Sequence, residues 1–220
     1  MTKEELREDP ILDGLMRFKA WVQQQSTLLT VILAILVVAG AGFQISRRVA
    51  ARGEQAAAIV LLDGESQYQN GNPGEALTKF KQAYEQHKGA PSGKVALLRA
   101  GDMQLEMGNF SDAQTLYKNF LGTKPKDGLL RASGLRGLAG ALDSAGQHEE
   151  AARQYLLAAE APESPLRADD LVSAANAFID AGKYPDAEAA FRKVIENYPE
   201  SARVRDAREG LETVKARLGT

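Results

Sequence analysis

The feature that most constrains this chain is a pattern that recurs four times after its first quarter. Four alanines align the copies, with spacings of 37, 38 and 36 residues: Ala76, Ala113, Ala151 and Ala187. An aromatic residue stands four positions after each alanine, a glycine five positions before it and a small residue twelve positions before it. Repetition at this period is typical of stacked supersecondary units, in which no single unit can bury its own apolar face.

Each recurring position has a physical role in a helix–turn–helix unit. Glycine takes the left-handed conformation that ends the first helix, which residues with a β-carbon resist. These glycines are Gly71, Gly108, Gly146 and Gly182. The aromatic residues that fill the space between one hairpin and the next are Phe80, Tyr117, Tyr155 and Phe191. Proline stops the second helix. The prolines in this role are Pro125, Pro162 and Pro199, with Pro91 a little later in the first unit.

The four units resemble tetratricopeptide repeats. The last one, residues 168–201, reads ADDLVSAANAFIDAGKYPDAEAAFRKVIENYPES and is the best match. The first and third units depart from the repeat at Pro73 and His148, which stand where an aromatic residue is expected. Gln67 and Gln104 stand where the repeat has Leu or an aromatic residue.

The pattern predicts an all-α fold, with an N-terminal single transmembrane helix, an α-solenoid of about four tetratricopeptide repeats and a C-terminal capping helix. The repeats fill residues 57–201, as units 57–90, 94–127, 132–165 and 168–201. Residues 202–220 form the cap, because their apolar residues follow one stripe and charges cover the other faces. The stripe consists of Val204, Ala207, Leu211, Val214 and Leu218. A partner-binding helix is the alternative interpretation of this segment.

The transmembrane helix is predicted at residues 28–46, within a stretch from Ala20 to Ser46 that has no charged residue. Its densest part, Leu28 to Ile45, would span about 27 Å as a helix, close to the hydrocarbon thickness of a bilayer. A buried core helix would be amphipathic, and a cleaved signal peptide would have a shorter apolar run after a short basic start. We therefore expect an uncleaved anchor, followed by a linker at 47–56.

Residues 1–27 are expected to form an N-terminal tail. Its apolar residues from Ile11 to Val22 recur at mostly helical spacing. They indicate either a helix on the membrane surface or an N-terminal extension of the anchor helix. Lys and Arg are almost balanced across the anchor, so the positive-inside rule does not decide its orientation.

The sequence carries no sign of catalysis. It has no cysteine and two histidines, and it lacks a Gly-rich phosphate loop and the HExxH and GxSxG motifs. We expect no enzyme activity, no cofactor, no metal site and no small-molecule substrate, and we interpret His148 as a packing residue. The mildly acidic body also argues against nucleic-acid binding.

The expected working surface is the concave face that the first helices of the stacked hairpins build. One position beyond the packing stripe on each first helix lies a second stripe, which should face the groove. It consists of Leu61, Glu65, Tyr68, Leu98, Asp102, Leu105, Arg136, Gly140, Asp143, Val172, Asn176 and Ile179. Half of these are apolar, and acids lie among them. Such a stripe indicates a groove for a helix or an extended apolar segment of a partner protein. The alternative is that several of these residues belong to the core.

The layout of the whole chain is similar to a known family. A charged tail leads through LMRFKAWVQQQSTLLTVILAIL into an anchor, and an Arg-rich segment leads on into repeats. This order resembles the bacterial YfgM-type family, ancillary subunits of the SecYEG protein-export translocon. The resemblance implies a single-pass protein of the bacterial inner membrane, with a cytoplasmic tail and periplasmic repeats. Its implied partners are the Sec translocon, a periplasmic chaperone and exported client proteins.

Two other scaffold functions stay open. The segment AFRKVIENYPES is similar to repeats of the cell-division coordinator CpoB and of outer-membrane assembly proteins, which indicates a cell-envelope scaffold of another kind. A reversed topology would instead make the chain a cytoplasmic membrane-tethered adaptor.

Overall fold

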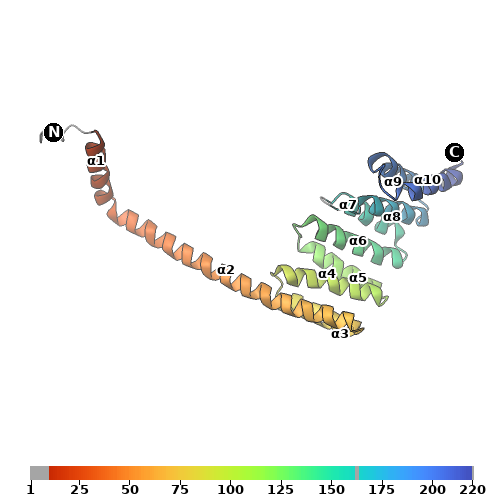
Figure 1. Ribbon diagram of the computed structural model, residues 1–220, viewed down its shortest axis with the longest axis horizontal. Coiled ribbons are helices and arrows are strands. Elements are labelled where there is room, and N and C mark those ends of the chain that lie inside the picture. The colour runs from red at the N-terminus through yellow and green to blue at the C-terminus, as the bar shows by residue number, and fades with distance from the viewer. Residues whose placement is uncertain (1–9, 162–163, 220) are drawn as a thin grey trace. The chain divides into compact units, whose positions relative to one another are not determined.

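The computed structural model describes residues 10–161 and 164–219, and over these residues the chain forms ten helices and no strand (Figure 1). The helices are α1 Pro10–Gln24, α2 Ser26–Gln69, α3 Pro73–Gln86, α4 Pro91–Glu106, α5 Phe110–Gly122, α6 Gly128–Ser144, α7 His148–Ala159, α8 Arg167–Asp180, α9 Tyr184–Asn197 and α10 Val204–Leu218. The all-α expectation is confirmed. The first nine residues of the predicted tail, and Pro162, lie outside the described residues.

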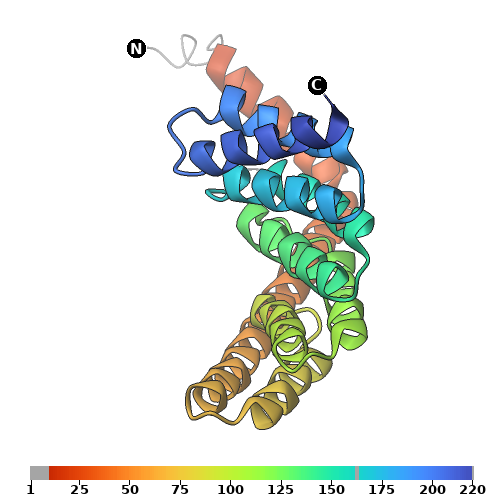
Figure 2. The same cartoon turned by 90° about the vertical axis from the view of Figure 1, so that its right-hand side faces the viewer.

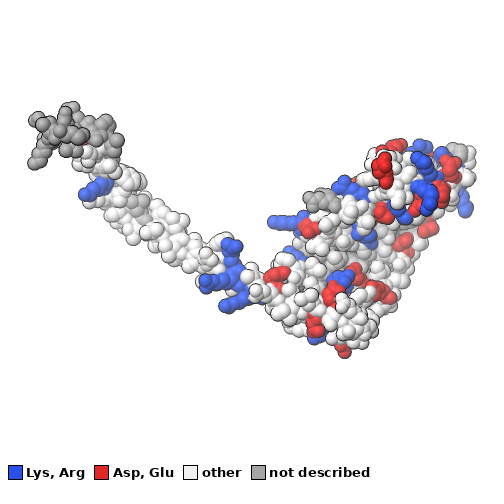
Figure 3. All heavy atoms as spheres, viewed as in Figure 1, with Lys and Arg blue, Asp and Glu red and all other residues white. Residues whose placement is uncertain are grey.

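The chain divides into two units, Met1–Arg52 and Gly53–Thr220. The predicted span 28–46 lies in the first unit, within the 44-residue helix α2, which is long and apolar enough to cross a membrane. No charged side chain is visible along this part of the helix in Figure 3. The segment 47–56, interpreted as a linker, is also part of α2, because it contains no proline and only one glycine to interrupt the helix.

The second unit is a stack of antiparallel helix hairpins (Figure 2). From α3 onward each helix packs against the next one in the chain. The first helices α4 and α6 of two successive hairpins also touch, and the first helix α8 of the last hairpin touches α10. The four glycines expected to end the first helices all have φ between +70° and +77°. Their left-handed conformation confirms the turn positions that the repeat pattern predicts.

Aromatic rings pack at positions where a helix has no β-carbon, both within a hairpin and between neighbouring hairpins. A β-carbon on Gly64 would lie 2.7 Å from Phe80 Cδ1, and one on Gly101 would lie 2.8 Å from Tyr117 Cε1. Tyr117 also lies against Gly137 of the next hairpin. Each ring therefore fills a space that only a glycine or another small residue leaves open.

Gln67 and Gln104, which stand where the repeat has Leu or an aromatic residue, accept hydrogen bonds from the turn after the first helix. The Nδ2 of Asn109 donates to Gln104 Oε1 at 2.8 Å, and the Nδ2 of Asn72 donates to Gln67 Oε1 at 3.2 Å. Gln104 is only 4% exposed, and its Nε2 donates to Asp112 at 3.3 Å. A hydrogen-bonded glutamine thus replaces the apolar side chain that the repeat has at this position.

Two further sequence interpretations are refined by the helix ends. Pro91 begins α4 and does not end α3, whose last residue is Gln86. A proline suits this first position of a helix, where its missing N–H has no helical partner. The predicted cap is α10, which buries Ala207, Leu211 and Val214, whereas Leu218 at its end is 37% exposed.

The glycine–aromatic contacts generate a stability prediction. Gly101→Val should lower the free energy of unfolding by about 1–3 kcal/mol, because the new side chain overlaps the buried ring of Tyr117. Gly74→Val is the matched control, since a β-carbon on Gly74 meets nothing within 4 Å, and it should change stability by less than about 0.5 kcal/mol. Urea unfolding followed by circular dichroism measures both. Equal unfolding midpoints for the two variants would contradict the packing described here.

Candidate functional site

The predicted groove stripe lies on the first helix of each hairpin, and two of its apolar members are not available to a partner. Leu98 is 6% exposed and Val172 is 2% exposed, so both belong to the core. The expectation that they line an open groove is wrong. Both are part of the hydrophobic core of the stack, on the first helices α4 and α8.

The remaining apolar members are only partly accessible. Leu61, Leu105 and Ile179 are half-buried and pack against the core, and Tyr68 is 37% exposed. The Oη of Tyr68 donates a hydrogen bond to Glu106 at 3.1 Å, which raises the pKa of the phenol. The stripe therefore presents polar groups between half-buried aliphatic side chains, and the open apolar groove that the sequence suggested is not formed by these residues.

Two polar members, Glu65 and Arg136, belong to ion pairs that join one hairpin to the next. Arg99 on α4 donates from Nη2 to Glu65 Oε2 on α2 at 2.7 Å, and it also contacts Asp102 at 3.3 Å. The Oη of Tyr117 donates to the other oxygen of Asp102 at 2.8 Å. Burial raises the pKa of Asp102, and these hydrogen bonds oppose that rise. Burial also raises the pKa of Tyr117, with Asp102 beside it.

The same arrangement recurs further along the solenoid. Arg136 on α6 donates two hydrogen bonds to Asp170 on α8, at 2.7 and 3.0 Å. Asp170 is 1% exposed, and burial raises its pKa although Arg136 opposes the rise. Arg203, just before α10, lies 3.3 Å from Asp169 on α8.

Sequence reasoning named Glu65, Asp102 and Arg136 but missed their partners. These partners are Arg99 and Asp170, and the separate pair of Asp169 with Arg203 was missed as well. A signal was present in the sequence, because each of the three pairs joins opposite charges that are 34 residues apart. Opposite charges one repeat apart on successive first helices are the pattern that would have found them.

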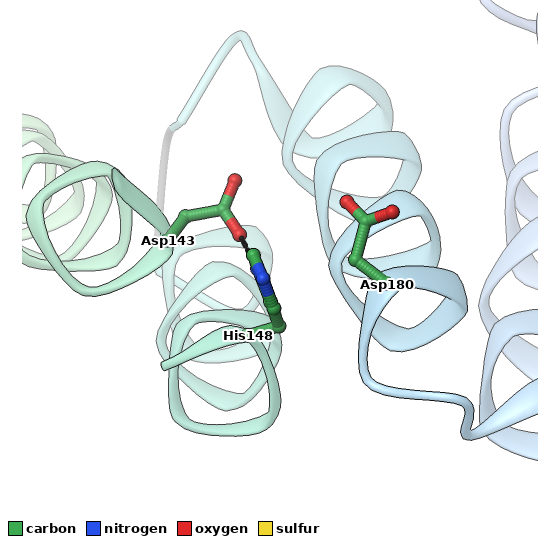
Figure 4. Close-up of side chains that lie close together, drawn as sticks. All are labelled: Asp143, His148 and Asp180. Atoms are coloured by element: carbon green, nitrogen blue, oxygen red, sulfur yellow. Dashed lines mark hydrogen bonds and ion pairs between the residues drawn. The ribbon is translucent and has the colours of Figure 1, made fainter. Parts of the chain in front are cut away.

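Of the other stripe members, Asn176 is exposed, Gly140 is half-buried and Asp143 belongs to a separate cluster (Figure 4). Asp143 Oδ1 on α6 lies 2.7 Å from Nδ1 of His148, the first residue of α7, and Asp180 at the end of α8 faces the same imidazole. The hydrogen bond to Asp143 raises the pKa of His148. His148 is therefore a hydrogen-bonding partner of Asp143, and the two side chains form an ion pair when the imidazole is protonated.

The cluster of Asp143, His148 and Asp180 is the one group of possible metal ligands within the described residues. One ligand atom from each side chain lies within 4.8 Å of the others. An imidazole with two carboxylates is a donor set that suits a divalent transition metal. The hydrogen bond between Asp143 and His148 accounts for the same geometry without a metal.

A stack of helix hairpins joined by rings and ion pairs defines a helical-repeat scaffold, a class of protein that binds other proteins along its surface. The tetratricopeptide repeat-like domain family matches residues 19–213, and the chain belongs to this family. Neither this match nor the similar solved structures indicate a catalytic family. No curated protein matches the sequence.

Solved structures show the same fold. A tetratricopeptide repeat protein from Parabacteroides merdae aligns with a TM-score of 0.60 at 22% identity, over 74% of this chain and 61% of that chain. MamA from Desulfovibrio magneticus RS-1 aligns with a TM-score of 0.57 at 17% identity, over 74% of this chain and 85% of that chain. The chain thus spans less than two thirds of the length of the Parabacteroides protein. At these identities the likeness concerns the fold alone.

The buried acid generates a second stability prediction. Arg136→Leu should cost about 3 kcal/mol of unfolding free energy, because it leaves the Asp170 carboxylate buried without its partner. Adding Asp170→Asn to this variant should recover part of the loss, since the uncompensated charge is removed. Arg192→Leu is the control, because it removes an exposed pair with Glu188 that is worth only about 0.3–0.5 kcal/mol. A loss for Arg136→Leu no larger than for Arg192→Leu in urea unfolding would refute the interpretation.

The contact between His148 and Asp143 generates a prediction about pH. The pKa of His148 should lie above its ordinary value of 6.5 in the folded chain, and Asp143→Asn should bring it back toward that value. Because the folded-state pKa is the higher one, the stabilising contribution of His148 is complete below pH 6.5 and is lost as the pH rises through the folded-state pKa. Imidazole proton shifts in NMR spectra measure the titration, and His87→Gln assigns the signals. A titration of His148 that Asp143→Asn leaves unchanged would count against the pair.

Proposed function

We propose that this protein is a membrane-anchored scaffold that holds other proteins beside a bilayer. The observation that supports this most is α2, because one helix contains both an apolar segment long enough to cross a membrane and the first helix of a tetratricopeptide-repeat solenoid. A solenoid of this family has the repeated surface of a protein-binding scaffold. The anchor would confine that surface to the neighbourhood of a membrane.

We further propose that the scaffold serves protein export at the Sec translocon of the bacterial inner membrane. The support is the layout of tail, anchor, arginines and repeats, which resembles the YfgM-type family. In this arrangement the tail is cytoplasmic and the repeats are periplasmic. They receive exported clients or pass them to a periplasmic chaperone.

The proposed partner surface is the row of first helices. It is more polar than the sequence predicted, because Leu98 and Val172 are buried. Its accessible members are mainly polar, with Glu65, Tyr68 and Asn176 among them. The ion pairs from hairpin to hairpin hold the charged side chains in fixed positions before a partner arrives. A surface that is already ordered loses less conformational entropy on binding. Partner contacts here are therefore expected to be hydrogen bonds and ion pairs around half-buried aliphatic side chains.

The experiment that tests this proposal begins with topology. The chain has no cysteine, so Lys126→Cys places a single thiol on the exposed loop between α5 and α6. A membrane-impermeant thiol reagent should label it in intact cells once the outer barrier is permeable, because the repeats lie outside the inner membrane. Thr2→Cys, in the tail, is the control that should react only after lysis. Labelling of Thr2→Cys before lysis, with protection of Lys126→Cys, would instead indicate a cytoplasmic tethered adaptor.

The same thiol chemistry then tests the partner. A thiol-linked photocrosslinker on Asn176→Cys, which is exposed on α8, should form adducts with a translocon subunit or with an exported protein in transit. Lys118→Cys, exposed on the second helix α5, is the matched control on another face. Equal adducts from both positions, or adducts with neither partner class, would remove the translocon assignment. Adducts of Asn176→Cys with division or outer-membrane assembly proteins would favour the other envelope function.

A further inference from the structure

Helix α1 is a separate element from the helix that follows it. It ends at Gln24 and α2 begins at Ser26, so that Gln25 is the only residue between them (Figure 1). The N–H of Gln25 still donates to the carbonyl of Trp21 at 2.9 Å. The sequence left open whether residues 11–22 form a helix on the membrane surface or an N-terminal extension of the anchor helix. The interruption at Gln25 argues against a continuous extension.

One face of α1 is apolar and uncovered. Leu15 is 59% exposed, Phe18 is 62% exposed and Trp21 is 51% exposed, and the rings of Phe18 and Trp21 stack with centroids 6.2 Å apart. At 100° per residue these three side chains lie within one third of the helix circumference, and Val22 lies among them. An apolar face of this kind is unfavourable in water, so it requires an apolar environment.

The position of α1 in the chain limits what that environment is. Only Gln25 separates it from the helix proposed to cross the bilayer, and Leu28, where the dense apolar run begins, is seven residues after Trp21. A helix attached this closely to a membrane span lies within reach of the bilayer surface whatever its direction. The bilayer is therefore the apolar environment that is always present beside it.

The charges of α1 suit the same location. Arg17 and Lys19 are the immediate neighbours of Phe18, so they lie about 100° to either side of it, at the two edges of the apolar face. From these edges their long side chains can reach lipid phosphates while Phe18 points toward the acyl chains. Asp13, the acid of the first turn, lies on the opposite side of the helix.

We infer that α1 lies parallel to the bilayer at the boundary between headgroups and acyl chains, as a second, interfacial attachment next to the span. This inference rests on the proposed function, because it requires that α2 crosses the membrane. It has a geometric consequence. A helix in the membrane plane keeps Leu15 and Trp21 at the same depth, whereas a perpendicular extension of the anchor would place Leu15 about 20 Å beyond Leu28, in water.

The test uses the single tryptophan of the sequence, Trp21, as a depth probe. The full chain is reconstituted into vesicles of phosphatidylcholine and phosphatidylglycerol that contain lipid brominated near the headgroup. Two tryptophans are expected to lie in the lipid: Trp21 of the unsubstituted chain, and the tryptophan of the double variant with Trp21→Phe and Leu15→Trp. Both should fluoresce at a shorter wavelength than a tryptophan in water does. Both should be quenched by the brominated lipid and protected several-fold from aqueous acrylamide. The matched control is Trp21→Phe with Gln24→Trp, on the polar face, which should be quenched by acrylamide.

The outcomes separate this inference from the proposed anchor. If the chain floats with the vesicles and resists alkaline extraction but the tryptophan at position 15 behaves like the one at position 24, the anchor stands and the interfacial helix is refuted. If the tryptophan at position 15 is shielded from acrylamide and not quenched by brominated lipid, protein covers the face, which refutes the inference in favour of a second copy or a partner. If the chain does not remain with the vesicles, the membrane span fails, and the interfacial helix fails with it.

Discussion

The structure depends on aromatic rings that occupy the space left by missing β-carbons. Tyr117 lies against Gly101 of its own hairpin and against Gly137 of the next one, and Phe191 lies against Gly210 of the capping helix. Tyr117 and Phe191 are each only 1% exposed. Because one ring touches two hairpins, it fixes both the closure of a hairpin and its distance from the neighbour. The positions of the first helices, and hence of the surface proposed to bind partners, follow from these contacts.

The ion pairs act on the same interfaces in a different way. Burial of Asp170 costs desolvation energy that Arg136 offsets only in part, so this pair is weak support for stability. It does specify the alignment of the hairpins, because a displacement of α6 relative to α8 would leave a buried carboxylate unpaired. Glu65 with Arg99 joins the first helices of two other neighbouring hairpins, and Asp169 with Arg203 joins the last hairpin to the start of the capping helix. Rings therefore set the spacing between hairpins and charges set their alignment.

The parts of the structure that were predictable from the sequence are those encoded within one repeat. The helices and the left-handed glycines depend on residues less than one repeat apart, and the structure confirms them. The exposure of the candidate site was not predictable in this way. Leu98 and Val172 are buried in the core of the stack, and helical spacing within one repeat contains no information on how the neighbouring helices pack around them. Gln67 and Gln104 looked like interruptions because their partners, Asn72 and Asn109, lie in the turn and outside the apolar pattern.

The linear stacking of the second unit has a consequence for its cooperativity. From α3 to α10 each helix packs mainly on its neighbours in the chain, so the free energy of the solenoid is close to a sum of local interfaces. A hairpin at one end can therefore open while the others persist. A partner that binds along several first helices adds contacts between repeats that the chain itself lacks. Such a partner would make the repeats open together or not at all, so that binding changes the lifetime of the whole solenoid without changing its shape.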